Sequence, residues 1–154
     1  MKERWLPVGV LVGVLFGINV LARLIARFAF SEDTELQDRL SLAMFATIGL
    51  VLATLAFIRG QRRPLPDWGG EMALAVLIAM VLTIFVGPFI SGSQPFGAGA
   101  GAFFSQIWLY AGFTAGGVLL GYLVLTALGR DYRSRSLKRF AEAKQAKPRR
   151  VVRR

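Results

Sequence analysis

The sequence predicts an all-α integral membrane protein with four transmembrane helices, cytoplasmic N- and C-termini and a basic C-terminal tail. Hydrophobic residues make up 55% of the 154 residues, and the mean hydropathy is +0.53, which is too apolar for an ordinary soluble domain of this length. Four stretches approach the roughly 20 apolar residues that a helix needs to cross about 30 Å of hydrocarbon. Basic residues gather in alternate segments between these stretches, as the positive-inside rule requires.

The first two spans are expected over residues 6–30 and 40–58. The first apolar run is longer than the core of a signal peptide, and no small-residue cleavage pattern follows it, so we interpret it as a retained span. Thr34 and Gln37 fit a capping box ahead of the second span, and Pro64 prevents that helix from continuing.

The third and fourth spans are expected over residues 72–90 and 103–128. Because proline lacks a backbone N–H, Gly87-Pro88 should loosen or end the last turn of the third span. The glycine-rich stretch 91–102 has the composition of a loop. The third span is rich in Leu, Ile, Met and Val, and we expect it to face lipid.

Positive charge indicates how the spans are oriented. With four spans, the N-terminus, the loop between spans two and three and the C-terminal tail lie on one side, and these carry the basic residues Lys2, Arg4, Arg59, Arg62 and Arg63 together with those of the tail. Both termini are therefore expected in the cytoplasm. Together with the richness in alanine, glycine and arginine, this pattern favours a bacterial cytoplasmic (inner) membrane. Trp5 and Trp68 are then expected at the inner interface and Trp108 near the outer one.

The chain divides into a four-helix transmembrane domain, residues 1–130, and a basic cytoplasmic tail, residues 131–154. From Arg130 onward, eleven basic residues stand against two acidic ones and supply +9 of the chain's net charge of +10. A basic tail is not a basic domain, so no nucleic-acid partner is expected. The tail should contact anionic lipids or, alternatively, an acidic patch on a cytoplasmic partner, and its candidate contact residues are Arg133, Arg135, Lys138 and Arg139.

Glycines recur at every fourth position of the first span, at Gly9, Gly13 and Gly17. Residues four apart share one helix face, and small residues let two helix backbones approach closely in lipid. We therefore expect a second helix against this row. It could belong to this chain, to a second copy or to a different protein.

The second and fourth spans have small-residue faces of their own. The candidate packing residues are Ala46, Gly49 and Ala53 in the second span and Gly112, Gly116, Gly117 and Gly121 in the fourth. A four-helix bundle could use all of these faces internally, or some could contact partner subunits.

Two arginines near the end of the first span, Arg23 and Arg27, share a face with Asn19. Ionisable residues within a span suggest function. These arginines could bind an anion, a lipid phosphate or the carboxylate of a partner. Alternatively, both extend to the interface and pair with nearby acidic residues, namely Glu32, Asp33, Glu35 and Asp38.

The chain contains no cysteine and no histidine, so it has no thiol nucleophile, no thiolate metal site and no imidazole base. We expect no enzymatic activity and no cofactor held by ligands of this chain, although a lipid, quinone or pigment could bind between chains. The expected function is that of a non-catalytic accessory subunit of a larger membrane complex, respiratory or transport, with other integral membrane subunits as partners. The alternative is a small homo-oligomeric transporter or channel.

Overall fold

A computed structural model describes residues 2–29, 34–97 and 99–145. All the regular elements in these residues are helices, and four helices are long and apolar enough to cross a membrane. Three of the four are single helices, namely α1 (Lys2–Ala29), α2 (Thr34–Arg62) and α5 (Ala100–Ala127). The remaining span is built from α3 (Leu65–Val81), the π-helix η1 (Leu82–Val86) and α4 (Gly87–Ile90). A shorter helix, α6 (Tyr132–Gln145), follows.

The expected number of spans is confirmed, but the second and third helices extend beyond the expected ranges. The second helix starts at Thr34 rather than at residue 40, and the third starts at Leu65 rather than at residue 72. The expected ranges counted only apolar residues, whereas helix ends depend on capping and on proline. Pro64 stands just before α3 in an extended conformation, with φ −65° and ψ 152°.

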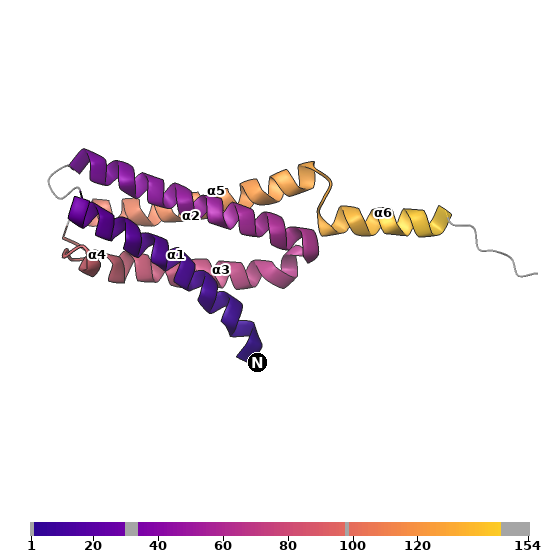
Figure 1. Cartoon of the computed structure of the whole chain (residues 1–154), viewed down its shortest axis with the longest axis horizontal. Coiled ribbons are helices and arrows are strands. Elements are labelled where there is room, and N and C mark those ends of the chain that lie inside the picture. Colours follow the sequence, from indigo (N-terminus) through magenta and orange to yellow (C-terminus); the bar gives the residue numbers. More distant parts are fainter. Residues whose placement is uncertain (1, 30–33, 98, 146–154) are drawn as a thin grey trace, which may run out of the picture.

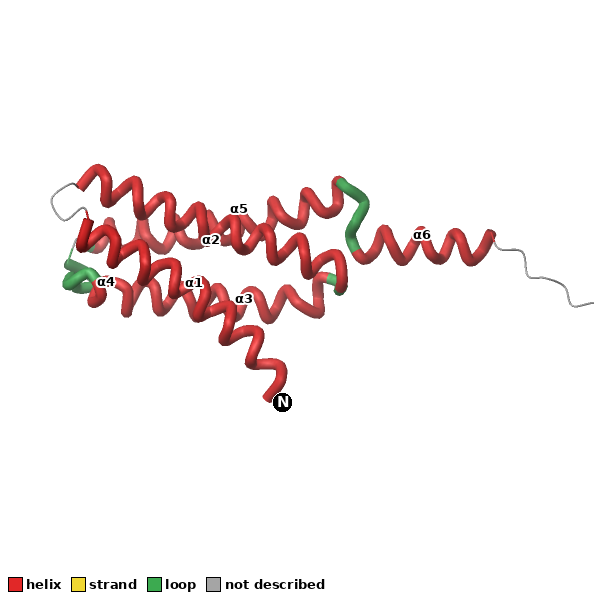
Figure 2. Tube along the Cα trace, viewed as in Figure 1, coloured by secondary structure: helices red, strands yellow, loops and turns green. Residues whose placement is uncertain are grey.

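The spans run antiparallel along the long axis of the molecule (Figures 1 and 2). The start of α1, the α2–α3 turn and α6 lie at one end, which we call the tail end. The described part of the loop between α4 and α5, residues 91–97 and 99, lies at the opposite end, which we call the loop end. The beginning of α1 and the whole of α6 thus lie at the same end, as an even number of spans requires.

The closest packing in the bundle joins α2 to α5 through glycine. A Cβ atom on Gly49 would lie 2.8 Å from the carbonyl oxygen of Phe113. A Cβ on Gly117 would collide with the backbone of Gly49, and one on Gly121 with the backbone of Ala53. The two backbones therefore touch, which only glycine permits and which gives van der Waals contact in lipid.

The third span packs against α1 on one side, so the expectation that it faces lipid is wrong for that face. Leu11 and Leu15 of α1 are buried in the same core as Trp68, Ala75 and Ala79 of α3. Two alanines four residues apart leave room for the leucines of α1. Trp68 is only 2% exposed and belongs to this core, not to an interfacial belt.

The end of the third span is loosened, as Gly87-Pro88 predicted. The backbone N–H of Gly87 donates to the carbonyl of Leu82, five residues earlier, which is the π-helical pattern. Pro88 cannot donate to the carbonyl of Ile84, so one α-helical bond is missing at this point. Downstream, the hydroxyls of Ser91 and Ser93 donate to the carbonyl of Pro88, at 2.9 Å and 3.2 Å.

The α2–α5 contact predicts that Gly121→Ala destabilises the bundle by about 1–3 kcal/mol, because the added methyl group overlaps backbone that cannot move aside. Gly112→Ala, on the same helix, is the matched control, since no atom lies within 4 Å of its Cβ position. This control should be neutral or stabilising by up to about 1 kcal/mol. Unfolding of both variants by SDS in mixed micelles measures the difference. Equal stabilities would contradict the described packing.

Candidate functional site

The glycine row of α1 lies on the side of the helix that faces away from the bundle. No atom lies within 4 Å of the Cβ positions of Gly9, Gly13 or Gly17. The buried face of α1, which includes Leu11 and Leu15, is on the opposite side. No described part of the chain therefore covers the row, which we call the α1 row.

The four glycines of α5 divide between two faces. Gly117 and Gly121 form the contact with α2, whereas Gly112 and Gly116 have open space at their Cβ positions. Gly112 and Gly116 border an apolar groove of about 480 Å³ between α2 and α5, which we call the α5 groove. Of the candidate residues in α2, Gly49 and Ala53 contact α5 glycines, and Ala46 lines the α5 groove.

A second apolar groove, of about 560 Å³, separates α1 from α2. It forms because α1 crosses α3 and diverges from α2 toward its N-terminal end (Figure 1). Val10 and Val14 line the α1 side, each next to a glycine of the α1 row, and Leu50 and Thr54 line the α2 side. The α1 row therefore lies beside this groove.

At the loop end, α1 presents a buried polar group to the bundle. Asn19 is fully buried, and its Nδ2 donates to the sulfur of Met44 at 3.1 Å. Its Oδ1 accepts a bond from Nε of Arg23, also at 3.1 Å. A Cβ on Gly87 would lie 2.7 Å from the Arg23 Nε. The guanidinium of Arg23 therefore occupies space that only a glycine at position 87 leaves open.

The two arginines of α1 reach the residues that follow α4. Nη1 of Arg23 lies 3.4 Å from Oγ of Ser91, and Nη1 of Arg27 donates to the carbonyl of Ile90 at 3.0 Å. Neither forms an ion pair with a carboxylate of the described residues, in which Glu35 pairs with Arg39 at 2.6 Å. The structure thus does not show the expected pairing with Glu35 or Asp38, because the arginines turn toward α4 instead of α2. Glu32 and Asp33 lie outside the described residues.

Arg23 lines a pocket of about 430 Å³ at the loop end, which we call the loop-end pocket. Its polar lining comes from four segments and includes Arg23, Gln37, Asp38, Ser41, Ser91, Ser93, Gln94, Ser105 and Gln106. Sequence reasoning did not find this pocket. Its only signal was a set of polar residues beside the third and fourth spans, and nothing in that pattern placed them next to Arg23.

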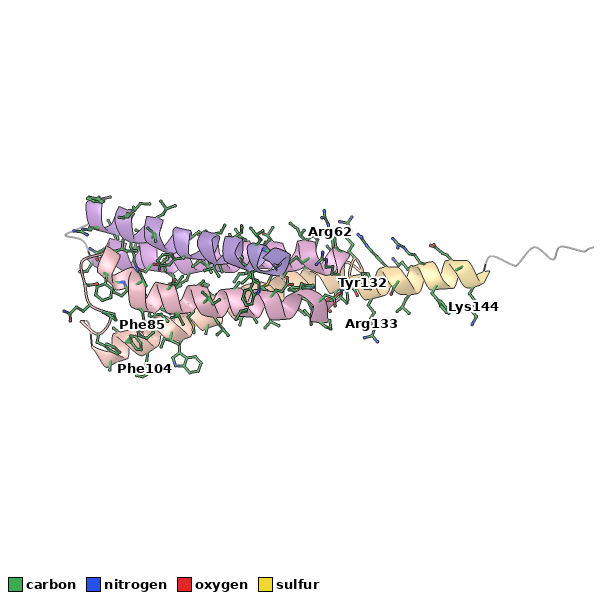
Figure 3. The ribbon with its side chains drawn as sticks, turned by 90° about the horizontal axis from the view of Figure 1, so that it is seen from below. Arg62, Phe85, Phe104, Tyr132, Arg133 and Lys144 are labelled. Atoms are coloured by element: carbon green, nitrogen blue, oxygen red, sulfur yellow. The ribbon has the colours of Figure 1, made fainter. Side chains whose placement is uncertain are left out.

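The tail begins with a capped helix. The Asp131 carboxylate accepts the backbone N–H of Ser134 at 3.1 Å, and bonds from the Ser134 hydroxyl and backbone hold the pKa of Asp131 below its usual value. The α6 helix extends beyond the bundle along its long axis (Figure 3, which labels Tyr132, Arg133 and Lys144). The candidate lipid contacts on α6 are all solvent-exposed, and they are Arg133, Arg135, Lys138 and Arg139.

In the part of the chain that the structure describes, no three Asp or Glu side chains lie close enough together to hold a metal ion. No protein-family model, curated protein or solved structure matches the chain. The functional proposal therefore rests on the residues and geometry described above.

The cap of α6 predicts a pH dependence. Because the pKa of Asp131 is depressed by folding, its stabilising effect is complete above the unfolded value of 3.8 and is lost as the pH falls through the lower folded value. The protection factor of the Ser134 amide, measured by hydrogen exchange, should therefore fall on acidification from about pH 6 to below pH 3. Asp131→Asn, which keeps a capping oxygen without a titrating proton, should show no such fall. Identical pH profiles for the two proteins would rule out this cap.

Proposed function

We propose that the protein is a non-catalytic accessory subunit of a larger complex in a bacterial cytoplasmic membrane, and that it docks through the α1 row on a transmembrane helix of a different protein. One observation carries the proposal. Gly9, Gly13 and Gly17 stand in register on the outside of the bundle, with open space at every Cβ position.

The chemistry of the α1 row indicates what kind of partner would cover it. The row lies inside an apolar span, so the covering surface also lies in hydrocarbon, where a backbone must satisfy its own hydrogen bonds as a helix. Lipid tails are as apolar as leucine, so helix association there depends on close packing over small residues. The groove beside the row, walled by Val10 and Val14, provides a seat for such a helix.

A different protein is a better partner than a second copy because this chain has little with which to act alone. It carries no cysteine and no histidine, and the mass outside its spans is mainly the basic tail. An accessory role places the chemistry in the partner. Positive charge at the tail end supports a cytoplasmic location for that end.

The alternative is a small homo-oligomeric transporter or channel. The loop-end pocket, which is polar and holds a half-buried arginine, favours it. If the α1 row of one copy packed into the α5 groove of the next, the contact would be heterologous, and such contacts close into a ring when the rotation between copies closes.

We further propose that α6 contacts anionic lipids at the cytoplasmic surface. The exposed side chains of Arg133, Arg135, Lys138 and Arg139 would contribute on the order of 1 kcal/mol each near such a surface. Leu137 and Phe140, three residues apart and 61% and 67% exposed, provide an apolar contact on the same helix. To reach the surface, α6 would turn at the segment before it, where Gly129 has φ +61°.

Gly13→Leu should abolish docking, because its side chain would fill the space that the partner helix occupies. The full-length protein, purified in mild detergent from its native membrane, should have the native mass of a stoichiometric complex with a second integral membrane protein. A photo-crosslinker at position 13 should reach that protein.

Gly70→Leu is the control for this experiment, since Gly70 is also exposed with open space at its Cβ position. The control should keep the complex. A monomer, or an oligomer of this chain alone, would contradict the accessory role, and a closed homo-oligomer would favour the transporter or channel.

Removal of residues 134–154 should leave membrane insertion intact and weaken binding of the detergent-solubilised protein to vesicles containing phosphatidylglycerol. Co-sedimentation with such vesicles measures the loss, and vesicles of phosphatidylcholine alone provide the reference. The expected loss is tenfold or more, because the removed segment contains several basic residues that each contribute on the order of 1 kcal/mol near the surface. Equal binding by the full and shortened chains would refute the lipid contact of α6.

A further inference from the structure

We propose that the loop-end pocket binds the phosphate group of a membrane phospholipid, with the Arg23 guanidinium as its ligand and the α5 groove as the seat of an acyl chain. This site is separate from the α1 row and does not depend on the accessory role.

The charge of Arg23 has no counter-ion among the described residues. It lies half-buried within a span, where a cation is costly unless an anion compensates it. Its two hydrogen-bond partners in the described residues, Asn19 and Ser91, are neutral. Asp38 also lines the pocket but forms no ion pair with Arg23. A guanidinium has five N–H donors in a planar fork that matches phosphate oxygens, and the Nη2 group makes no hydrogen bond to a described residue.

The guanidinium of Arg23 is held in one place by its neighbours. The buried amide of Asn19 orients Nε, and the missing Cβ of Gly87 makes the space. The π-helix and Pro88 direct Ser91 toward Nη1. An arginine that only extends to the interface needs no such contacts. Arg27, one turn later, is exposed and bonds only to a backbone carbonyl among the described residues.

The loop-end pocket lies at a depth that suits a lipid headgroup. Arg23 lies six residues before the end of α1, about 9 Å along the helix axis. Phe103 lines the pocket and forms ring contacts with Phe85, Phe96 and Phe104, and Figure 3 shows Phe85 and Phe104 at this end. Trp108, one turn after Phe104, is 77% exposed. Tryptophan is enriched at the depth of the lipid headgroups.

The surroundings of the pocket favour a lipid over free phosphate as the source of the anion. Leu109 lines both the loop-end pocket and the α5 groove, so an apolar groove adjoins the polar pocket at this residue. Gly112 and Gly116, which lack side chains, line the α5 groove further along the helix. A phosphate at Arg23 would thus have its acyl chain beside these glycines.

The test uses the full-length protein, stripped of lipid in a maltoside detergent that carries no phosphate. Dioleoyl-phosphatidylglycerol is titrated in and counted by native mass spectrometry. One lipid per chain should bind, and Arg23→Gln should weaken binding tenfold or more, because it removes a charge-assisted contact. Arg39→Gln removes an equal charge from α2, outside the pocket, and should bind as the wild type does.

Two further probes separate the possible sources. Dioleoylglycerol, which has the same chains without phosphate, should bind at least tenfold more weakly, and equal binding would overturn the role of phosphate. Inorganic phosphate should not displace the lipid at millimolar concentration. Displacement that depends on Arg23 would overturn the lipid source.

A second variant protects the test against misfolding of Arg23→Gln. Ser105→Phe fills the pocket from α5, and the Ser105 hydroxyl bonds only to Ala102 in its own helix among the described residues. Ser105→Phe should reduce lipid binding as strongly as Arg23→Gln does. Wild-type binding by either variant, in protein that remains folded and monodisperse, would overturn the proposal.

Discussion

The backbone contact between α2 and α5 is the constraint on which the rest of the structure depends. Gly49 and Ala53 of one helix touch Gly117 and Gly121 of the other, so the two backbones lie closer than any larger side chains would allow. In lipid, where the hydrophobic effect gives helices little reason to associate, this dispersion contact is what holds them together. It also decides that the remaining glycines of α5, Gly112 and Gly116, face outward.

The loop end depends on a different interaction. A proline removes one hydrogen bond from the third span, and the resulting π-helical turn brings Gly87 opposite Asn19 and Arg23. The polar groups of α1 can then enter the bundle without a clash. Local loosening of a helix thus makes room for a charge at a depth where bulkier packing would exclude it. The serines that follow α4 complete the surroundings of that charge.

The two proposed sites both include residues of α1, but they lie on different segments of this helix. The α1 row is a flat apolar surface suited to another helix, and it lies toward the tail end. Asn19 and Arg23 lie toward the loop end and face the bundle. Partner docking and phosphate binding therefore involve different residues of one helix. A substitution in one of these sites can therefore be made at a residue that does not belong to the other site.

The sequence by itself determined the number of spans, the weak point at Gly87-Pro88 and the basic tail. These follow from the length of each apolar stretch, the missing N–H of proline and the number of charges, and each of these properties belongs to a single segment of the chain. The sequence also identified the small-residue faces of the first, second and fourth spans, but not the face of Ala75 and Ala79 that packs against α1. Only the tertiary structure decided which faces are used: Gly117 is covered, Gly116 and Gly13 are open, and the bulky third span contributes Trp68 to the core. Likewise, the sequence showed that Arg23 is a charge within a span, but it did not show the contacts with Asn19 and Ser91 that hold its guanidinium. Periodicity along one chain defines a face of a helix, whereas the neighbour of that face depends on how all the helices pack together in three dimensions.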